Sequence, residues 1–123
     1  MHRDKSVPVL SRVDVEGWSG WSRKEGVDFV QPPREFMDSL VAVRLSIDPD
    51  QVGSGSLVVV PGSHLGVDSG SPVPVPVGRG GALVFSPSLL HKSSRIERGQ
   101  RRVLHFLFAP SRLPGGLQWA YAA

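Results

Sequence analysis

The sequence predicts an all-β fold built from short strands. Its 123 residues include 14 glycines and 11 prolines. These are about 11% and 9% of the chain, against average usage of about 7% and 5%, and both residue types favour turns. Between the turns, apolar residues alternate with other residues along several segments, as in strands that bury one face. Helical signals are weak. Many short strands with this punctuation favour a double-sheet jelly roll or a related sandwich.

The clearest strand covers residues 41–47. Every second residue from Val41 to Ile47 is large and apolar, which predicts that this set of side chains packs on the core. Asp48-Pro49-Asp50 ends the strand, Gly53-Ser54-Gly55 supplies a turn, and the apolar run 57–60 follows. A strand, a glycine-rich turn and a second strand predict a hairpin. Pro61-Gly62-Ser63-His64 then ends the second strand.

Proline dominates the next segment, residues 72–77, where it alternates with valine. Because proline has no backbone N–H, this segment is predicted to be an edge strand or an extended, polyproline-like arm. Gly80-Gly81 ends it. The apolar run 82–85 that follows is predicted to be a short buried strand.

The last strand is predicted at residues 101–109. Pro87 begins a turn that leads to His91, and Gly99-Gln100 separates His91 from this strand. One helical turn is predicted where Pro32-Pro33 precedes Arg34-Glu35-Phe36-Met37, because proline is favoured at the start of a helix. The sequence has no internal repeat and no long linker, so residues 1–123 are predicted to form a single domain.

Composition excludes several classes of protein. With 40% hydrophobic and 20% charged residues, the chain is typical of globular proteins. It has no cysteine, which excludes disulfides and thiolate metal sites. Charged residues near the start exclude a signal peptide, and no apolar run is long enough for a membrane span. We therefore expect a cytoplasmic protein without membrane contact.

A basic cluster near the last strand contributes to the net charge of +3. Such a cluster either attracts phosphates and acidic substrates or is a solvated strand end. Its members are Lys92, Arg95, Arg98, Arg101 and Arg102. No aromatic residues interleave with them and no nucleic-acid motif is present, so a nucleic-acid partner is not expected.

His2, Asp4 and His91 are candidate metal ligands. His2 and Asp4 are two residues apart, which on a strand puts both side chains on one face. His91 lies 91 − 4 = 87 residues after Asp4 and is a candidate for the second imidazole. Two histidines and one carboxylate on one face of an octahedron are the ligands of non-haem iron(II) oxygenases. On spacing alone, ordinary surface or hydrogen-bonded core histidines remain an alternative.

A likeness to a known family extends over nearly the whole chain. The segments that carry it are His2-Arg3-Asp4, Trp21 to Val27, Val30-Gln31-Pro32-Pro33, Val43-Arg44-Leu45, Val60 to His64, Leu89 to Ser94, Arg101 to His105, and Leu113 to Trp119. In this order and spacing they resemble the bacterial branch of the phytanoyl-CoA dioxygenase family. Members of that family are iron(II)- and 2-oxoglutarate-dependent oxygenases.

The resemblance implies a double-stranded β-helix, a cupin-like jelly roll, in which His2, Asp4 and His91 bind iron(II). It also implies that an arginine eleven residues after the distal histidine binds the far carboxylate of 2-oxoglutarate, and 91 + 11 = 102 selects Arg102. A guanidinium suits this role because its planar fork makes two parallel hydrogen bonds to a carboxylate. Arg101 and Arg102 point to opposite faces of a strand, so one of them is expected to face the interior.

Four further residues receive roles from the same resemblance. Ser93 matches a position that helps to hold the cosubstrate carboxylate. Trp21 matches an aromatic residue near the cosubstrate, and a buried core tryptophan explains it nearly as well. His64 is expected to be structural, within a strand-ending turn. His105, on the face opposite Arg102, is expected to be a packing residue.

The resemblance implies a dioxygenase that uses iron(II), 2-oxoglutarate and O2 to hydroxylate a small organic or acyl substrate, with succinate and CO2 as co-products. The family fold carries a long region before the His-x-Asp pair, so this chain is expected to be its C-terminal portion, incomplete at the N-terminus. Arg3 stands where the family usually has glutamine. Two alternatives remain: an inactive, truncated paralogue completed by a homodimer partner, and a cupin-like binding module without oxygenase activity.

Overall fold

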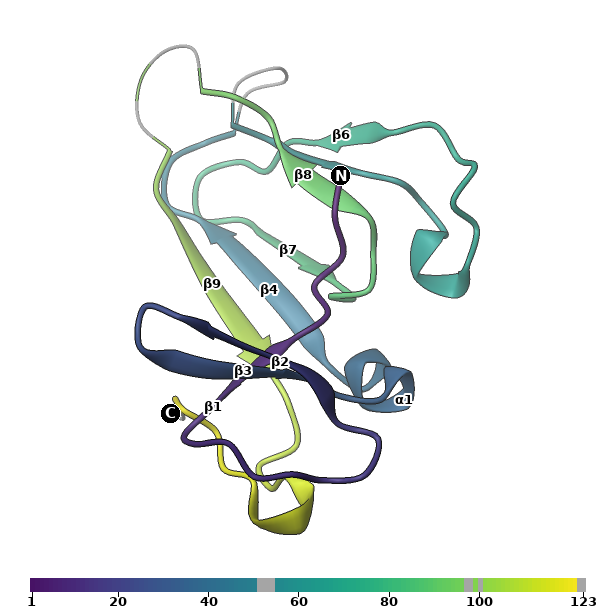
Figure 1. Ribbon diagram of the computed structural model, residues 1–123. Helices are drawn as coiled ribbons and strands as arrows, with labels where there is room; N and C mark the ends of the chain where they lie inside the picture. The colour runs from purple at the N-terminus through teal and green to yellow at the C-terminus, as the bar shows by residue number, and fades with distance from the viewer. Residues whose placement is uncertain (51–54, 97–98, 100, 122–123) are drawn as a thin grey trace. The chain divides into compact units, whose positions relative to one another are not determined.

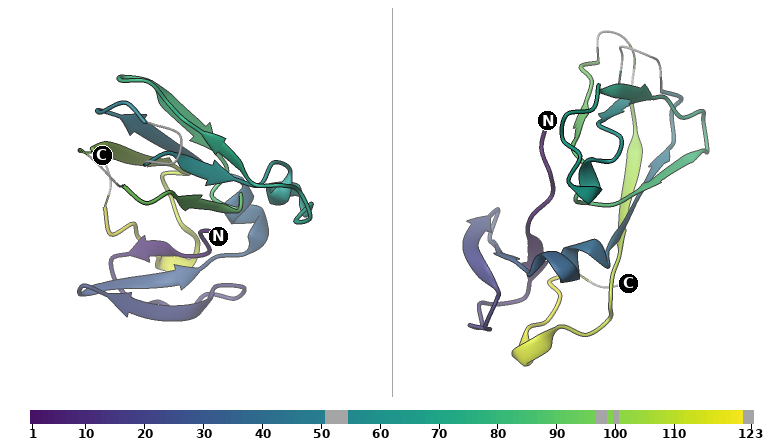
Figure 2. Two further views of the ribbon diagram at one scale, coloured as in Figure 1. Left: turned by 90° about the horizontal axis from the view of Figure 1, so that it is seen from above. Right: turned by 90° about the vertical axis from the view of Figure 1, so that its right-hand side faces the viewer.

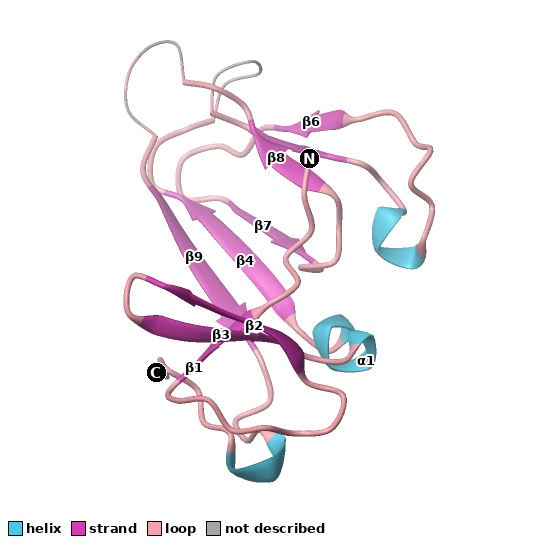
Figure 3. Cartoon of the chain, viewed as in Figure 1, coloured by secondary structure: helices cyan, strands magenta, loops and turns pink. Residues whose placement is uncertain are grey.

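The computed structural model describes residues 1–50, 55–96, 99 and 101–121. These residues form two compact units, the first made of Met1–Asp4 and Leu40–Phe108, and the second of Lys5–Ser39 and Ala109–Ala123. Strands predominate among them (Figure 3). None of the helices in the described part of the chain is long and apolar enough to cross a membrane. The turn predicted at Gly53-Ser54 lies outside the described residues.

One sheet of the first unit has β4 at its centre. It contains β4 (Val41–Ser46), β7 (Ala82–Phe85) and β9 (Val103–Phe108) in the order β7-β4-β9. Both pairings are antiparallel, and in them Arg44 is opposite Leu83 on one side and His105 on the other. The three strands can be followed side by side in Figures 1 and 2.

A second sheet of the same unit contains β5 (Leu57–Val59), β6 (Val73–Val75) and β8 (His91–Ser93), in the order β6-β5-β8. The predicted hairpin of residues 41–47 with 57–60 is therefore wrong. Each of the two segments is paired on both edges within its own sheet, so they cannot pair with each other. Residues 73–75 form the edge strand that the alternating prolines predicted, since among the described strands β6 pairs with β5 alone.

The inner faces of these two sheets meet. The Phe85 ring of β7 lies 5.4 Å from the His91 ring of β8, centroid to centroid. Arg44 of β4 donates from Nη2 to the carbonyl oxygen of Gly55, just before β5, at 2.9 Å. A short 3-10 helix, η1 (Ser63–Leu65), follows β5. Strands that alternate between two facing antiparallel sheets are the arrangement of a jelly roll, which confirms the predicted fold class.

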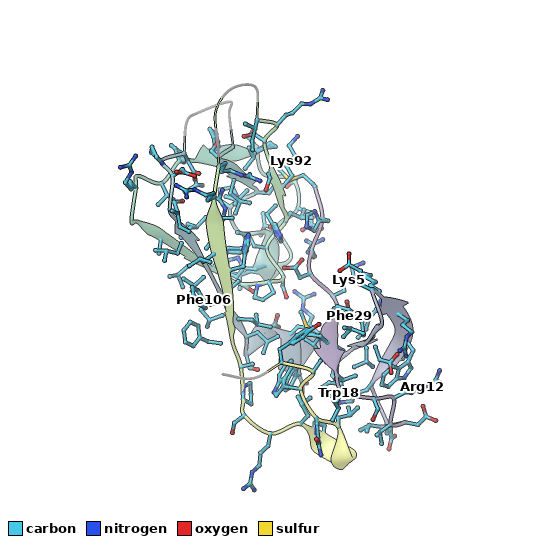
Figure 4. All side chains as sticks on the ribbon, turned by 90° about the vertical axis from the view of Figure 1, so that its left-hand side faces the viewer. Lys5, Arg12, Trp18, Phe29, Lys92 and Phe106 are labelled. Carbon is cyan, nitrogen blue, oxygen red and sulfur yellow. The ribbon has the colours of Figure 1, made fainter. Side chains whose placement is uncertain are left out.

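The buried face of β4 is not the one that its apolar pattern predicted. Val41 is 41% exposed, whereas Arg44 is 1% exposed and Ser46 is fully buried. The outward face of this sheet also carries exposed apolar residues from the neighbouring strands: Val84, Leu104, Phe106 and Phe108. Figure 4 shows Phe106 projecting from β9. β4 therefore turns Arg44 and Ser46 to the inner face of the sheet, where Leu83 and Phe85 of β7 also lie, and the outer face is apolar.

The second unit contains the remaining described strands. β1 (Val7–Val9), β3 (Val27–Gln31) and β2 (Ser19–Lys24) form an antiparallel sheet in the order β1-β3-β2. The helix α1 (Arg34–Asp38) begins after Pro33, as predicted. A second 3-10 turn, η2 (Pro114–Gly116), lies near the C-terminus.

Aromatic rings and valines form the core of the second unit. The Trp18 and Phe36 rings lie 4.9 Å apart, centroid to centroid, and Trp18 is 7% exposed. Val7 and Val30 of the sheet are fully buried. Trp18 and Phe29 are labelled in Figure 4. This small core holds the strands that the sequence pattern did not predict.

Candidate metal centre

Two histidines and one aspartate meet in the first unit. His2, Asp4 and His91 each offer a ligand atom, and these atoms all lie within 4.8 Å of one another. One oxygen of Asp4 lies 3.8 Å from His2 Nε2, and the other lies 3.8 Å from His91 Nε2. Neighbouring ligand atoms of an octahedral ion are about 3 Å apart when each bond is about 2.1 Å long. Small side-chain shifts therefore suffice to surround one ion.

The backbone makes the two histidines cross-strand neighbours. His2 and His91 exchange two N–H···O hydrogen bonds of 3.0 Å, one in each direction. Directly paired residues project to the same face, and the two imidazole centroids are 4.5 Å apart. Asp4 shares this face by strand alternation, and its N–H donates to the carbonyl of Pro87 at 3.0 Å. Position 2 is thus held by an isolated β-bridge with two backbone hydrogen bonds.

His91 presents a defined nitrogen to the cluster. Its Nδ1 lies 2.7 Å from the carbonyl oxygen of Leu89. A carbonyl only accepts, so Nδ1 carries the proton and Nε2 keeps its lone pair. The His91 side chain is 9% exposed, which limits its rotation. A metal-binding histidine is commonly fixed in this way, through a hydrogen bond from its other nitrogen to a carbonyl.

Positive charge lines the interior beside the cluster. His105, on β9, has a pKa below the usual 6.5, mainly because burial disfavours its charged form and also because Arg44 and Arg101 repel it. The negative charge of Asp4 raises the pKa of His105, whereas His91, like the two arginines, lowers it. His105 therefore lies within electrostatic reach of the cluster and of both arginines.

Arg44 and Arg101 meet at the carbonyl of Gly55. Arg44 Nη2 and Arg101 Nη1 both donate to this oxygen at 2.9 Å. Within the described residues, the buried Arg101 Nε and the buried Ser46 hydroxyl have no hydrogen-bond partner. Buried polar groups are normally paired, because leaving one unpaired costs about 1–3 kcal/mol. The inner face thus offers donors that a polar ligand can satisfy.

Arg102 lies on the other side of the chain from Arg101. Its Nε and Nη2 donate to the two oxygens of Asp48 at 2.9 and 3.0 Å, and its side chain is 63% exposed. These bonds lower the pKa of Asp48 to about 2. Alternation along β9 places Arg101, not Arg102, on the side of His105. The structure therefore does not bring Arg102 to the cluster, and its role in binding 2-oxoglutarate stays a prediction.

The other predicted residues are found in different places. Ser93 is exposed and shares a face of β8 with His91 by alternation. Trp21 is on β2 of the second unit, where the Arg12 guanidinium lies 5.2 Å from its ring centroid. His64 is in η1, outside the metal cluster. His105 lies on the face opposite Arg102, as expected.

Comparison with known proteins decides the family. The family model described as phytanoyl-CoA dioxygenase (PhyH) matches residues 18–103, which is more than half of the chain. The chain belongs to the phytanoyl-CoA dioxygenase family. The double-sheet fold of the first unit and the His-Asp-His cluster agree with membership in this family of non-haem iron oxygenases.

A solved structure has a similar fold. The chain is similar to AviO1 from Streptomyces viridochromogenes Tue57, with a TM-score of 0.56 and 27% sequence identity. The alignment covers 92% of this chain and 47% of AviO1, so the chain spans about half the length of that protein. No curated protein sequence matches the chain.

The phytanoyl-CoA dioxygenase match covers only part of the cluster. Residues 18–103 include His91, Ser93 and Arg102, but the match begins after His2 and Asp4. These two residues join the cluster through their backbone pairing with the segment around His91. The cluster as a whole is therefore a feature of the structure and not of the family match.

Sequence reasoning missed two residues that hold segments next to the ligands, and also a buried ion pair of β4. Arg3 and Ser63 bond to segments next to the ligands, and Arg44 forms a buried ion pair with Asp50. The signal for Arg44 was present, since an arginine stands in the middle of an apolar strand. Nothing in the sequence distinguishes Arg3 from an exposed arginine.

Proposed function

We propose that this member of the phytanoyl-CoA dioxygenase family is an iron(II)- and 2-oxoglutarate-dependent dioxygenase that hydroxylates a small organic or acyl substrate. The observation that carries the proposal is the triad of His2, Asp4 and His91, whose ligand atoms lie within 4.8 Å of one another. Bound iron(II) would supply the activation of O2 at the expense of 2-oxoglutarate, with succinate and CO2 as co-products. Two histidines and one carboxylate leave three positions for cosubstrate and O2.

The chain's own residues have separate roles in this proposal. Asp4 supplies the negative charge, and its two oxygens face the two imidazoles. His91 Nε2 points its lone pair at the centre because its Nδ1 proton is held by Leu89. His2 and Asp4 side chains are 63% and 49% exposed, so substrate and O2 approach from their side. Ser93 is proposed to assist with the cosubstrate, since it shares a strand face with His91.

An arginine is proposed to bind the far carboxylate of 2-oxoglutarate, and two candidates stand next to each other. Sequence spacing selects Arg102. Strand alternation supports Arg101, and so does the lowering of the His105 pKa by the Arg101 charge. Arg102 is engaged with Asp48 on the exposed side. Arg101 Nε is buried and unpaired among the described residues. These contacts favour Arg101.

An anaerobic binding experiment tests the function. Iron(II) and 2-oxoglutarate are added, the weak visible charge-transfer band is recorded, and succinate is measured after O2 is admitted. The wild type is expected to give both signals. Asp4→Ala should give neither, and loss of the band in Arg101→Ala but not in Arg102→Ala would assign the anchor. Arg23→Ala serves as control, because Arg23 pairs with Asp28 in the second unit.

The same experiment separates the alternatives. A folded chain that gives no band would support the inactive paralogue and refute the proposal for this chain. A band without succinate release would support the cupin-like binding module. Succinate release that survives Asp4→Ala would show that the turnover does not arise at the triad.

We also propose a cytoplasmic homodimer. Support for self-association comes from the exposed apolar face of the β7-β4-β9 sheet, on which Val84 is 62%, Phe106 48% and Phe108 62% exposed. Exposed apolar patches of this kind mark association surfaces. Sedimentation of the wild type and of Phe106→Ser across a range of concentrations tests this, and a wild type that stays monomeric at high concentration rules it out.

A further inference from the structure

We infer that Arg3 and Ser63 form a clasp that positions all three proposed metal ligands. The inference rests on the proposed function, since it concerns the same centre. Arg3 stands between His2 and Asp4 in the sequence, and Ser63 lies in η1. Neither residue offers a ligand to the cluster, so both act through the ligands and are positioning residues.

Arg3 ties the N-terminal segment to η1 and to the segment before β8. Its Nε donates to the carbonyl of Ser88 at 3.0 Å, and its Nη2 donates to the carbonyl of Ser63 at 3.1 Å. The guanidinium also pairs with the carboxylate of Asp68. As a result, a side chain at position 3 is only 28% exposed. A terminal strand without such contacts is normally poorly ordered.

Ser63 connects Arg3 to the segment that carries His91. Ser63 is fully buried, and its hydroxyl oxygen accepts a hydrogen bond of 2.8 Å from the N–H of Leu90. Leu90 precedes His91, and its carbonyl accepts from Val60 N–H at 3.0 Å. Ser63 therefore bonds through its carbonyl to the segment with His2 and Asp4, and through its hydroxyl to the segment with His91.

The Arg3 bonds restrain a motion that the backbone bonds between His2 and His91 leave free. The bonds between His2 and His91 lie along the sheet, so they fix the spacing of the strands but leave their rotation about the strand axis less constrained. By alternation, Arg3 projects to the face opposite His2 and Asp4. Bonds to that side chain restrain the rotation, and hence the direction of both ligands. Metal bonds tolerate errors of only about 0.2 Å.

The experiment is a titration of the whole chain with Co²⁺ alone, followed by visible absorption. Wild type, Arg3→Gln, Arg3→Lys and Ser63→Ala are compared, with Arg23→Gln as a matched control because Arg23 also makes an ion pair and a carbonyl hydrogen bond. Loss of residues that orient ligands typically weakens metal binding about 10- to 100-fold. We expect that loss in Arg3→Gln and Ser63→Ala, a smaller one in Arg3→Lys, and none in Arg23→Gln.

Folding of each variant without metal is measured by circular dichroism, and titrations are run at a temperature at which that variant is folded. If Ser63→Ala fails to fold, Asp68→Asn replaces it, because this change weakens the ion pair between Arg3 and the more exposed Asp68. Folded Arg3→Gln that binds Co²⁺ as tightly as the wild type overturns the clasp. A wild type that binds no Co²⁺ overturns the proposed function instead, so the two failures are distinguishable.

Discussion

The ion pair between Arg44 and Asp50 offers a test of the inner face of the first unit. Arg44 Nη1 lies 2.7 Å from one oxygen of Asp50, and Nη2 lies 3.4 Å from the other. The two side chains are 1% and 0% exposed. The perturbation is Asp50→Asn, which keeps the size of the side chain and removes its charge.

The expected cost follows from burial. Removing one partner of a buried pair leaves an uncompensated charge and costs about 3–5 kcal/mol. In Asp50→Asn the guanidinium of Arg44 keeps its bond to the Gly55 carbonyl and one oxygen at position 50. We therefore expect a loss near the lower end of that range, about 3 kcal/mol. Single domains are stable by about 5–15 kcal/mol, so this loss is large.

Urea denaturation followed by circular dichroism measures the effect. With a slope of about 1–3 kcal/mol per molar urea, a loss of about 3 kcal/mol lowers the midpoint by about 1 M or more. Asp48→Asn is the matched control, because Asp48 makes the corresponding two-oxygen pair with Arg102 on the exposed side. A pair with one exposed partner is expected to contribute less to stability than a pair with both partners buried. Equal midpoints for the two variants would refute the reasoning.

Three further predictions concern single residues. The pKa of His105 is lowered, mainly by burial. Its contribution to stability is therefore present above the unfolded value of 6.5 and is lost as pH falls through the folded value. Denaturation at several pH values should show that His105→Gln loses less stability than the wild type as the pH falls. Arg102 lowers the pKa of Asp48 to about 2, so the contribution of Asp48 to stability is present above 3.8 and is lost as pH falls through about 2. In Arg102→Gln, a carbon NMR titration of Asp48 should give a pKa near the ordinary 3.8. A titration curve that does not move contradicts the pairing. Gly55→Ala should cost about 1–2 kcal/mol, because Gly55 has a φ of +86° and a Cβ would lie 2.7 Å from Arg101 Cδ; a denaturation midpoint equal to the wild type argues against it.

Local patterns in the sequence found most strands of the first unit. Apolar alternation predicted β4, glycine and proline marked the ends of β5 and β7, and alternating proline predicted the edge strand β6. These are properties of neighbouring residues. The hairpin failed because partner choice depends on which sheet each strand enters, and no local pattern records that. The strand β2, Ser19–Lys24, was missed because its residues are mostly polar and exposed.

The metal cluster was found for a different reason than the strands. His2 and Asp4 were paired by their spacing, His91 was a candidate for the second imidazole, and the family resemblance then implied that all three bind iron(II). Strand alternation also predicted that Arg101 and Arg102 lie on opposite sides, but not which side is the interior. That choice depends on Asp48, which is 102 − 48 = 54 residues away in the sequence. A contact over such a distance is visible only in the fold.

The polar residues that β4 buries link stability to the proposed chemistry. An apolar face on β4 would stabilise the sheet more simply, and replacing a buried ion pair with apolar residues is often neutral or stabilising. The chain instead buries Arg44 on the inner face of β4 and leaves Arg101 Nε and the Ser46 hydroxyl without partners among the described residues. Violations of ordinary packing are expected at functional sites. If these donors serve a bound carboxylate, 2-oxoglutarate should raise the melting temperature of the wild type more than that of Arg101→Ala. Equal shifts would mean that the buried charge has only a structural role.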